Sequence, residues 1–277
     1  MVREQVGSIA SLWRYPVKSM LGEALESSEV TAHGLLGDRA YALRDVQTGR
    51  IASAKNPKKW AKLLDFQAAL EATPQAHESV PAVKVILPDG NSITSEASDA
   101  STVLSKLLGQ EVQLLSSVPE TSTLDQYWPA VEGTAHQDTV TELLMPPGTF
   151  FDSCSIHAIT TATLARLQEL YPEGQFEPKR FRPNFVIEPT SAEVTFLEDA
   201  WVGGTLAIGD QVRLSIDTEC PRCVVTTLAQ AGLPEDLNIL RTTAKHNKVI
   251  AGIRMSVLQG GIIRCNDLIW LEKETDL

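Results

Sequence analysis

The sequence is poor in cysteine and has no long apolar stretch. Its 277 residues include four cysteines, Cys154, Cys220, Cys223 and Cys265, which are too few for a disulfide framework. We therefore expect a reducing, cytoplasmic setting. No segment approaches the ~20 consecutive apolar residues that a helix needs to cross a bilayer, and residues 1–12 lack the apolar core of a signal peptide. The sequence predicts a protein that does not interact with a membrane.

Positive charge is also scarce. The chain has 24 Lys and Arg against 35 Asp and Glu, which gives a formal net charge of −11. Because phosphate groups would be repelled, this balance argues against nucleic acid as a partner. It leaves room for a local basic pocket that holds a small anionic ligand. The hydrophobic share of 43% and charged share of 21% are ordinary for a folded globular chain, so global disorder is not expected.

Short β-forming runs separated by glycine and proline fill the first 115 residues. Such runs predict a barrel or sandwich, and Pro88-Asp89-Gly90 is a strong hairpin signal. Apolar residues at helical spacing predict a helix over Ala100–Leu108. The other elements expected here are strands over Val6–Trp13, Ala24–Ala32, Ala40–Asp45, Val83–Leu87 and Asn91–Ser95, and a helix over Pro57–Leu64.

Residues 116–149 are rich in proline and glycine and predict a domain boundary or a long active-site loop. Residues 150–277 then form the second domain, in which Leu164, Leu167 and Leu170 give a helix an apolar face. The expected fold class is mainly β with several helices, or α+β. The elements expected in this part are helices over Thr160–Leu170 and Pro234–Arg241 and strands over Asn184–Ile187, Leu206–Ile208, Val212–Ile216, Val224–Thr226, Ile250–Leu258 and Ile262–Leu271.

The sharpest local motif is Cys220-Pro221-Arg222-Cys223. The pair could be a redox dithiol, in which Arg222 stabilises a thiolate. It could also supply half of a zinc site, or one thiolate to a softer metal. Alternatively, both cysteines could be buried and pack as small hydrophobic residues. Zinc needs two more ligands, and the five histidines are scattered without metal-ligand spacing.

Basic residues recur at turn-rich sites. They lie in Tyr15-Pro16-Val17-Lys18-Ser19, in Gly37-Asp38-Arg39 and in Arg180-Phe181-Arg182-Pro183-Asn184. Guanidinium groups bind phosphate through a planar fork and an ammonium binds it as a point charge, so these residues could converge on an anion. They could equally be ordinary surface charges, because spacing does not show that they meet.

Asp152 and Ser153 precede the predicted helix at Thr160. Both residue types cap helices, and the same backbone could hold an anion. A hydrolase that uses Ser153, His157 and Asp152 is disfavoured, because the chain has no G-x-S-x-G motif and triad partners are rarely so crowded in sequence.

In their order along the chain, these stretches resemble the MOSC superfamily in its two-part form, which includes the amidoxime-reducing molybdenum enzymes. The resemblance implies an N-terminal β-barrel domain over residues 1–115 and a MOSC β-barrel domain over residues 150–277. The motifs that carry it are Tyr15-Pro16-Val17-Lys18-Ser19, Gly37-Asp38-Arg39, Phe181-Arg182-Pro183-Asn184, Glu198-Asp199-Ala200-Trp201, Ile208-Gly209-Asp210, Cys220-Pro221-Arg222-Cys223 and Val257-Leu258-Gln259-Gly260-Gly261.

The resemblance also implies a molybdenum cofactor, a pterin dithiolene that carries a phosphate. Cys223 matches the family's metal-ligating cysteine, and Cys223 and Asp152 are the expected catalytic residues. The implied activity is the two-electron reduction of a small N-hydroxylated substrate, with electrons from a separate donor protein. The residues implied to contact the cofactor are Lys18, Ser19, Arg39, Asp152, Ser153, Arg182, Asn184, Arg222 and Cys223.

Two alternatives remain open. One is a module that carries the cofactor, or sulfur on Cys223, without turnover of its own. The other is a metal-free protein whose Cys220 and Cys223 cycle between dithiol and disulfide. Cys265 lies in Arg264-Cys265-Asn266-Asp267, where the family usually has a Val-Gly-Asp type of turn, and is expected to be structural or incidental.

Overall fold

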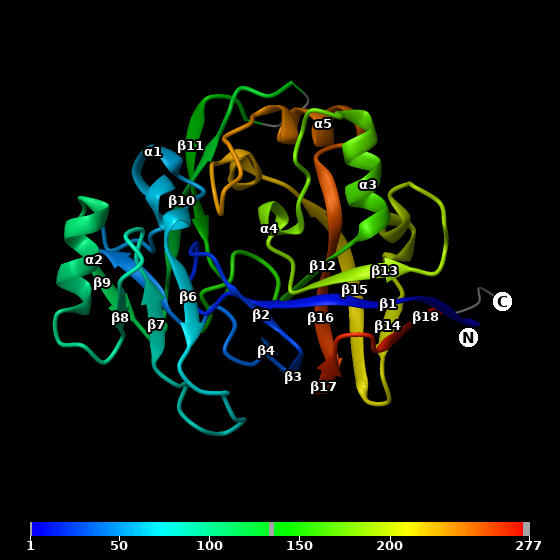
Figure 1. The fold of residues 1–277 in the computed structure, drawn as a ribbon, viewed down its shortest axis with the longest axis horizontal. Coiled ribbons are helices and arrows are strands. Elements are labelled where there is room, and N and C mark those ends of the chain that lie inside the picture. Colours follow the sequence, from blue (N-terminus) through cyan, green and yellow to red (C-terminus); the bar gives the residue numbers. More distant parts are fainter. Residues whose placement is uncertain (1, 133–135, 274–277) are drawn as a thin grey trace.

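A closed ring of seven strands forms the right-hand part of the molecule in Figure 1. The computed structural model describes residues 2–132 and 136–273. Strand β1 closes the ring because it pairs with β18 on one side and with β13 on the other. Around the ring the strands are β1 (Val2–Arg14), β13 (Phe185–Pro189), β12 (Ile156–Thr160), β16 (Ile250–Gln259), β15 (Val212–Pro221), β14 (Thr205–Ile208) and β18 (Leu268–Lys273).

The barrel interior is built from both ends of the chain. In β1 the side chains of Val6, Ile9 and Leu12 are buried, with a register shift after Ile9 that keeps the apolar residues facing inward. They pack against Phe185 and Ile253 from distant strands. The first strand of the chain therefore completes the barrel formed by the C-terminal half. The domain boundaries at 115 and 149 stay a prediction.

The N-terminal half forms smaller sheets around a second core, on the left of Figure 1. Buried Trp60, Phe66 and Leu104 lie in this core, which helix α2 covers. Its elements are β5 (Ala42–Asp45) paired with β9 (Val112–Leu115), the sheet of β6 (Gln67–Leu70), β7 (Val83–Ile86) and β8 (Ser92–Thr94), and the helices α1 (Pro57–Trp60), η1 (Ala61–Asp65) and α2 (Ala100–Leu108). Four short strands lie between the two halves: β2 (Glu23–Leu25) pairs with β1, and β3 (Ser27–Thr31) pairs with β4 (Gly34–Leu35) and β17 (Gly261–Arg264).

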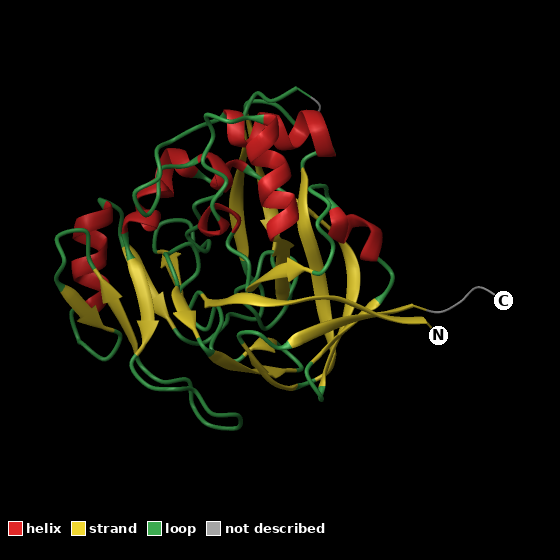
Figure 2. Cartoon of the chain, turned by 45° about the vertical axis from the view of Figure 1, so that its right-hand side comes forward, coloured by secondary structure: helices red, strands yellow, loops and turns green. Residues whose placement is uncertain are grey.

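Helices lie mainly on one side of the barrel strands, as Figure 2 shows in red. None of the helices in the described parts of the chain is long and apolar enough to cross a membrane. The helical elements of this half are α3 (Thr161–Leu170), α4 (Pro178–Phe181), η2 (Leu197–Trp201), η3 (Val224–Thr227) and α5 (Asn238–Asn247). The predicted fold class, mainly β with several helices, is confirmed.

The segment predicted as an irregular loop contains a regular hairpin. Strand β10 (Thr123–Trp128) pairs with β11 (Thr139–Leu144) along its whole length. Arg50 holds the two strands together, since its guanidinium reaches Asp125 at 2.7 Å and Glu142 at 2.7 Å. The prediction of a loop was wrong here because the prolines flank the strands instead of interrupting them.

The strand predicted over Val224–Thr226 is also wrong. These residues form the 3₁₀ helix η3, although β-branched side chains favour strands. The hydroxyl of Thr226 donates to the carbonyl of Cys223 at 3.0 Å and that of Thr227 to the carbonyl of Val224 at 2.8 Å. Buried Arg180 donates to the Thr226 carbonyl at 3.2 Å and to the Leu228 carbonyl at 3.2 Å. Tertiary hydrogen bonds thus override local preference and hold the turn that follows Cys223.

A fully buried carboxyl group, that of Glu198, connects η2 to the start of α3. It accepts hydrogen bonds from the hydroxyls of Thr160 and Thr163, each at 2.7 Å. Burial raises the pKa of Glu198, although these donors lower it. The native state therefore binds the proton more tightly than the unfolded chain, and wild-type stability falls as pH rises from the unfolded pKa of about 4.3 through the folded value.

Glu198→Gln is expected to remove this pH dependence. Glutamine does not titrate, so the variant should be about 1 kcal/mol less stable at pH 4, where one hydrogen bond is weakened, and should recover relative to wild type by pH 7. Urea denaturation at pH 4, 5.5 and 7 measures the difference. The exposed Glu169→Gln exchange is the matched control. A stability difference for Glu198→Gln that is the same at all three pH values would contradict this prediction.

Candidate functional site

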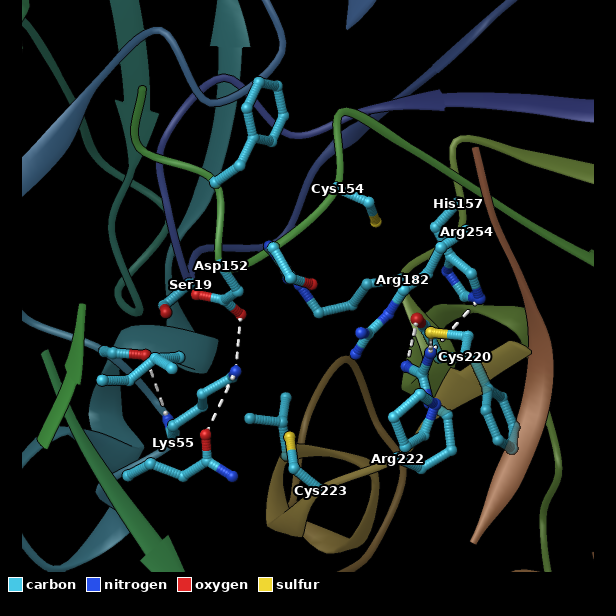
Figure 3. A pocket seen from close by; sticks show the side chains of 18 of the residues that line it. Ser19, Lys55, Asp152, Cys154, His157, Arg182, Cys220, Arg222, Cys223 and Arg254 are labelled. Atoms are coloured by element: carbon cyan, nitrogen blue, oxygen red, sulfur yellow. Dashed lines mark hydrogen bonds and ion pairs between the residues drawn. The ribbon is translucent and has the colours of Figure 1, made fainter. Parts of the chain in front are cut away.

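A cavity of about 550 Å³ lies where the barrel meets the N-terminal half and the β10–β11 hairpin. Several of its lining side chains are drawn in Figure 3. They come from segments far apart in the sequence, so only the tertiary fold brings them together. All nine residues predicted to contact the cofactor line this cavity: Lys18, Ser19, Arg39, Asp152, Ser153, Arg182, Asn184, Arg222 and Cys223.

Asp152 lies between two lysines. The Lys18 ammonium donates to Asp152 Oδ1 at 2.5 Å and to the Phe150 carbonyl at 2.6 Å, and the Lys55 nitrogen lies 3.1 Å from Asp152 Oδ2. Burial alone would raise the pKa of Asp152, but the two ammonium groups hold it far below its usual range. Asp152 is therefore a fixed carboxylate at neutral pH, which accepts hydrogen bonds and does not act as an acid there.

Two guanidinium groups converge on the ring of Tyr15. Arg39 lies 4.6 Å and Arg182 lies 4.3 Å from the ring centroid. Burial and then the neighbouring charge of Arg39 lower the pKa of Arg182 to about 10, and burial raises the pKa of Tyr15 to about 12. Arg39 is paired with buried Asp38, whereas Arg182 donates to the Met20 carbonyl at 2.7 Å. The aromatic face and Asp38 thus hold together two cations that repel each other.

Asn184 connects the N-terminal segment that contains Asp38 to barrel strand β12. Its Nδ2 donates to Asp38 at 2.9 Å and its Oδ1 accepts from the backbone N–H of His157 at 3.0 Å. Ser19 adopts a left-handed backbone with φ of 66°, and its hydroxyl accepts from the Ala54 N–H at 3.1 Å. Both side chains already have partners within the protein, so each also positions its neighbours.

Arg222 is held by two barrel side chains and by a carbonyl of helix α4. Its Nη1 donates to Cys220 Sγ at 2.9 Å and lies 3.2 Å from His157 Nε2, and its Nη2 donates to the Phe181 carbonyl at 2.6 Å. Burial would raise the pKa of Cys220, but His157, Arg222 and Arg254 lower it well below its usual value. Cys220 is therefore a buried sulfur whose ionised form is favoured by its cationic neighbours, and it accepts a hydrogen bond from Arg222.

Cys223 is half-buried at the start of η3, and Figure 3 shows it facing Lys55 and Asp152 across the cavity. Its carbonyl accepts from both the N–H and the hydroxyl of Thr226, at 3.2 and 3.0 Å, which fixes the turn. No cluster of three or more His, Cys, Asp or Glu side chains able to hold a metal exists within residues 2–132 and 136–273. A metal at Cys223 would thus need ligands from a bound group.

Sequence reasoning missed several residues that line the cavity, among them Lys55, Trp128, Leu143 and Arg254. Lys55 belongs to no motif, and only its contact with Asp152 reveals it. Trp128 and Leu143 lie on the hairpin that was predicted as a loop. Conversely, Arg180 does not line the cavity in the described structure, because it is fully buried behind η3.

The donor set fits an anionic ligand. Seven of the lining residues are lysine or arginine and one, Asp152, is a carboxylate, in a chain whose net charge is −11. The Nε atoms of Arg222 and Arg254 are buried and have no hydrogen-bond partner within the described residues. The excess of cations over carboxylates in the lining favours a ligand that supplies negative charge and acceptor atoms.

A β-barrel is joined to a smaller β domain, and the cationic cavity between them contains three cysteines. Such a cavity is suited to an anionic group beside a cysteine sulfur. Residues 147–270 match the MOSC domain and residues 6–114 match the MOSC N-terminal beta barrel domain. The chain belongs to the MOSC superfamily in its two-part form, as the sequence motifs predicted.

Several relatives are named for one activity. The mitochondrial amidoxime reducing component 2 of Rattus norvegicus is 28% identical over 241 residues, which cover 81% of this chain and 68% of the relative. The mitochondrial amidoxime-reducing component 1 of Homo sapiens is 25% identical over 237 residues, which cover 81% and 67%. The crystal structure of the YUAD protein from Bacillus subtilis aligns over 99% of both chains with a TM-score of 0.50 and 11% identity, which shows the fold alone.

Proposed function

We propose that this protein is a molybdenum-cofactor-dependent oxidoreductase that reduces small N-hydroxylated compounds with electrons from a separate donor protein. The observation that carries the proposal is the position of Cys223 in a cationic cavity together with every residue that the family motifs nominate for cofactor contact. The names of the relatives support the reaction class. None of the four cysteines forms a disulfide, which is consistent with the reducing, cytoplasmic setting that we propose.

The residues present fit the cofactor. When bound, it would supply two-electron redox chemistry that converts an N–OH compound, two electrons and two protons into the N–H compound and water. Cys223 offers a thiolate, which suits a soft metal. Lys18, Ser19, Arg39 and Arg182 would hold the anionic pterin, with Asp152 and Ser153 beside them.

Side chains of the protein form a fixed polar network beside Cys223. Burial lowers the pKa of Lys55, but the charges of Asp152 and Cys223 together raise it above its usual value, so Lys55 remains an ammonium. Its nitrogen lies 3.4 Å from Gln126 Oε1 as well as near Asp152. This fixed network can orient a polar N–OH group beside Cys223, while Trp128 and Leu143 contact the apolar part of a substrate.

Cofactor analysis tests the proposal most directly. Protein purified from a host that makes the cofactor should contain near-stoichiometric molybdenum by plasma mass spectrometry and a fluorescent pterin after oxidation. With dithionite as reductant, it should convert benzamidoxime to benzamidine. Protein that folds but contains neither molybdenum nor pterin would refute the proposed function.

The second candidate is a carrier of the cofactor or of sulfur without turnover. It is favoured by Cys220, a second cysteine that lines the same cavity as Cys223 and whose pKa is lowered by His157 and Arg222. A carrier would transfer its cofactor to an apo-enzyme, or sulfur from a persulfide, and would not reduce benzamidoxime with artificial donors. Turnover with dithionite therefore separates the two functions.

The β10–β11 hairpin lines the cavity with apolar side chains, which should favour substrates that carry an aromatic ring. Trp128 lines the cavity, and its indole N–H is fixed by Thr141 at 2.8 Å. We expect Trp128→Ala to raise KM about 10-fold for benzamidoxime but not for hydroxylamine, because only the former buries a ring against the indole. The control is Leu144→Ala, since Leu144 lies on the same hairpin and is 64% exposed. Equal changes in KM for the two substrates would refute a selective role for Trp128.

A further inference from the structure

Arg180 is a buried cation outside the cavity. Its side chain is fully buried behind η3, and it forms no ion pair in the part of the chain that the structure describes. Its donors reach four backbone carbonyls instead: Nε donates to Gln175 at 2.8 Å, Nη1 to Thr226 and Leu228, each at 3.2 Å, and Nη2 to Pro234 at 2.7 Å. The guanidinium thus joins the segment before α4 to the segment that runs from η3 toward α5.

The contacts of Arg180 explain why a charged residue is buried here. Burying a cation away from any carboxylate is unfavourable, and a well-packed apolar side chain would fill the same space at lower cost. Arginine offers five donors fixed in one plane, which can bind carbonyls of two chain segments at the same time. These contacts therefore indicate that Arg180 holds the two segments in one relative position.

The segment that carries Arg180 is packed against the barrel. Helix α4 ends at Phe181, whose ring is buried in a cluster with Val186 of strand β13. The Phe181 carbonyl accepts from Arg222, and the next residue, Arg182, lines the cavity. Arg180 thus extends from a part of the fold whose position relative to the cavity is already fixed.

Thr226 connects Arg180 to Cys223. The Thr226 carbonyl accepts from Arg180, and both the N–H and the hydroxyl of Thr226 donate to the carbonyl of Cys223, at 3.2 and 3.0 Å. Thr226 is itself buried. Cys223 immediately precedes η3, and Figure 3 shows its side chain directed toward the cavity. A displacement of Thr226 would therefore displace the backbone that carries the Cys223 sulfur.

We propose that Arg180 is a positioning residue for Cys223 and acts through Thr226. It keeps the sulfur in one place relative to the cations that line the cavity, although Arg180 does not reach the cavity itself. That Arg180 fixes the turn follows from these contacts, whereas the consequence for turnover rests on the proposed function. A misplacement of about 1 Å can slow a reaction about 100-fold, so turnover should depend on this contact.

Hydrogen exchange on cofactor-free protein tests whether Arg180 fixes the turn. In wild type, the Thr226 amide should exchange at least about 100-fold more slowly than in an unfolded peptide. Arg180→Lys keeps the charge but has a single nitrogen, which cannot bind carbonyls of both segments. Exchange at Thr226 should then be about 10-fold faster, because hydrogen bonds to a charged group are lost, while exchange in β14 should not change.

Lys179→Met is the matched control for hydrogen exchange and for turnover. Lys179 is the neighbouring cation and also donates to a carbonyl, that of Ala231 at 3.0 Å, which lies outside η3. This variant should exchange and turn over as wild type. Unchanged exchange at Thr226 in folded Arg180→Lys would overturn the proposal. Rapid exchange of the Thr226 amide in wild type would also overturn it, and that measurement requires no variant to fold.

The loaded enzyme tests whether the position of Cys223 matters for turnover. Arg180→Lys and Thr226→Val, which lacks the hydroxyl donor, should each lower kcat about 10-fold and leave KM for benzamidoxime unchanged, since the hairpin still contacts the substrate. If both act on Cys223 through the same contact, the double variant should lose no more than about 10-fold, whereas independent effects would multiply to about 100-fold. Multiplied losses, or wild-type kcat in Thr226→Val, would overturn the proposal. Wild-type protein that contains neither molybdenum nor pterin refutes the proposed function instead, and hydrogen exchange still decides whether Arg180 fixes the turn.

Discussion

Cys223→Ser is expected to abolish metal-dependent turnover while leaving the fold intact. Cys223 is half-buried, and its turn is held by backbone hydrogen bonds and Arg180, so serine can occupy the same position. A hydroxyl is a poor ligand for a soft metal. Losing an outer-shell partner of a metal already costs about 10–100-fold, so losing the ligand itself should cost more than about 100-fold in kcat/KM.

The measurement is dithionite-driven reduction of benzamidoxime together with the molybdenum-to-protein ratio. Cys265→Ser is the matched control, because Cys265 lies outside the cavity lining, where its sulfur contacts the Leu25 carbonyl at 3.4 Å. Its turnover should equal that of wild type. If Cys223→Ser retained molybdenum and full turnover, the assignment of Cys223 as metal ligand would be wrong.

Asp152→Ala is expected to cause the largest loss of stability among the cavity variants. It leaves Lys18, which is 5% exposed, and Lys55 without their carboxylate partner. Breaking a buried ion pair typically costs about 3–5 kcal/mol. Asp152 itself is 36% exposed, so solvent screening reduces the expected loss to about 2 kcal/mol. Asp152→Asn keeps a hydrogen-bond acceptor without the charge, so its stability should fall by less than that of Asp152→Ala.

This loss should depend on pH in a defined direction. The folded pKa of Asp152 is lowered, so its contribution is fully present above the unfolded pKa of about 3.9 and disappears as pH falls toward the folded value. Urea denaturation should therefore show the full difference between wild type and Asp152→Ala at pH 7 and a smaller one at pH 3. The exposed pair of Arg166 and Glu169 provides the control, since Glu169→Ala should cost at most about 0.5 kcal/mol. A difference that grows on acidification would refute the role of Asp152 as an ionised partner.

The motif residues were predictable because each lies where the backbone makes a tight turn. Ser19, Arg39 and Arg182 all have positive φ, with values of 66°, 48° and 53°. Turn residues such as Pro16, Gly37 and Pro183 mark these places in the sequence. Local chemistry therefore showed where loops could present charge, although it did not show that the loops meet.

The hairpin and η3 were not predictable in the same way. Both are determined by groups remote in sequence, since Arg50 joins the strands of the hairpin and Arg180 holds the turn after Cys223. Lys55 and Arg254 escaped notice because a single lysine or arginine is ordinarily a surface charge. In the structure, Lys55 differs from an ordinary surface lysine because it pairs with Asp152. Arg254 differs from an ordinary surface arginine because it lies opposite His157 and lowers the pKa of Cys220.

The sequence by itself determined the β-rich class, the family and the residue types of the cavity. Strand periodicity and turn chemistry depend on neighbours in the chain, so they can be read without coordinates. The tertiary structure alone decided that β1 closes the C-terminal barrel, that Cys220 is buried beside His157 and Arg222, and that Asp152 lies between two ammonium groups. These features depend on charges and burial that the fold brings together from separate segments, such as Lys18 and Asp152, and the local sequence does not show that such segments meet.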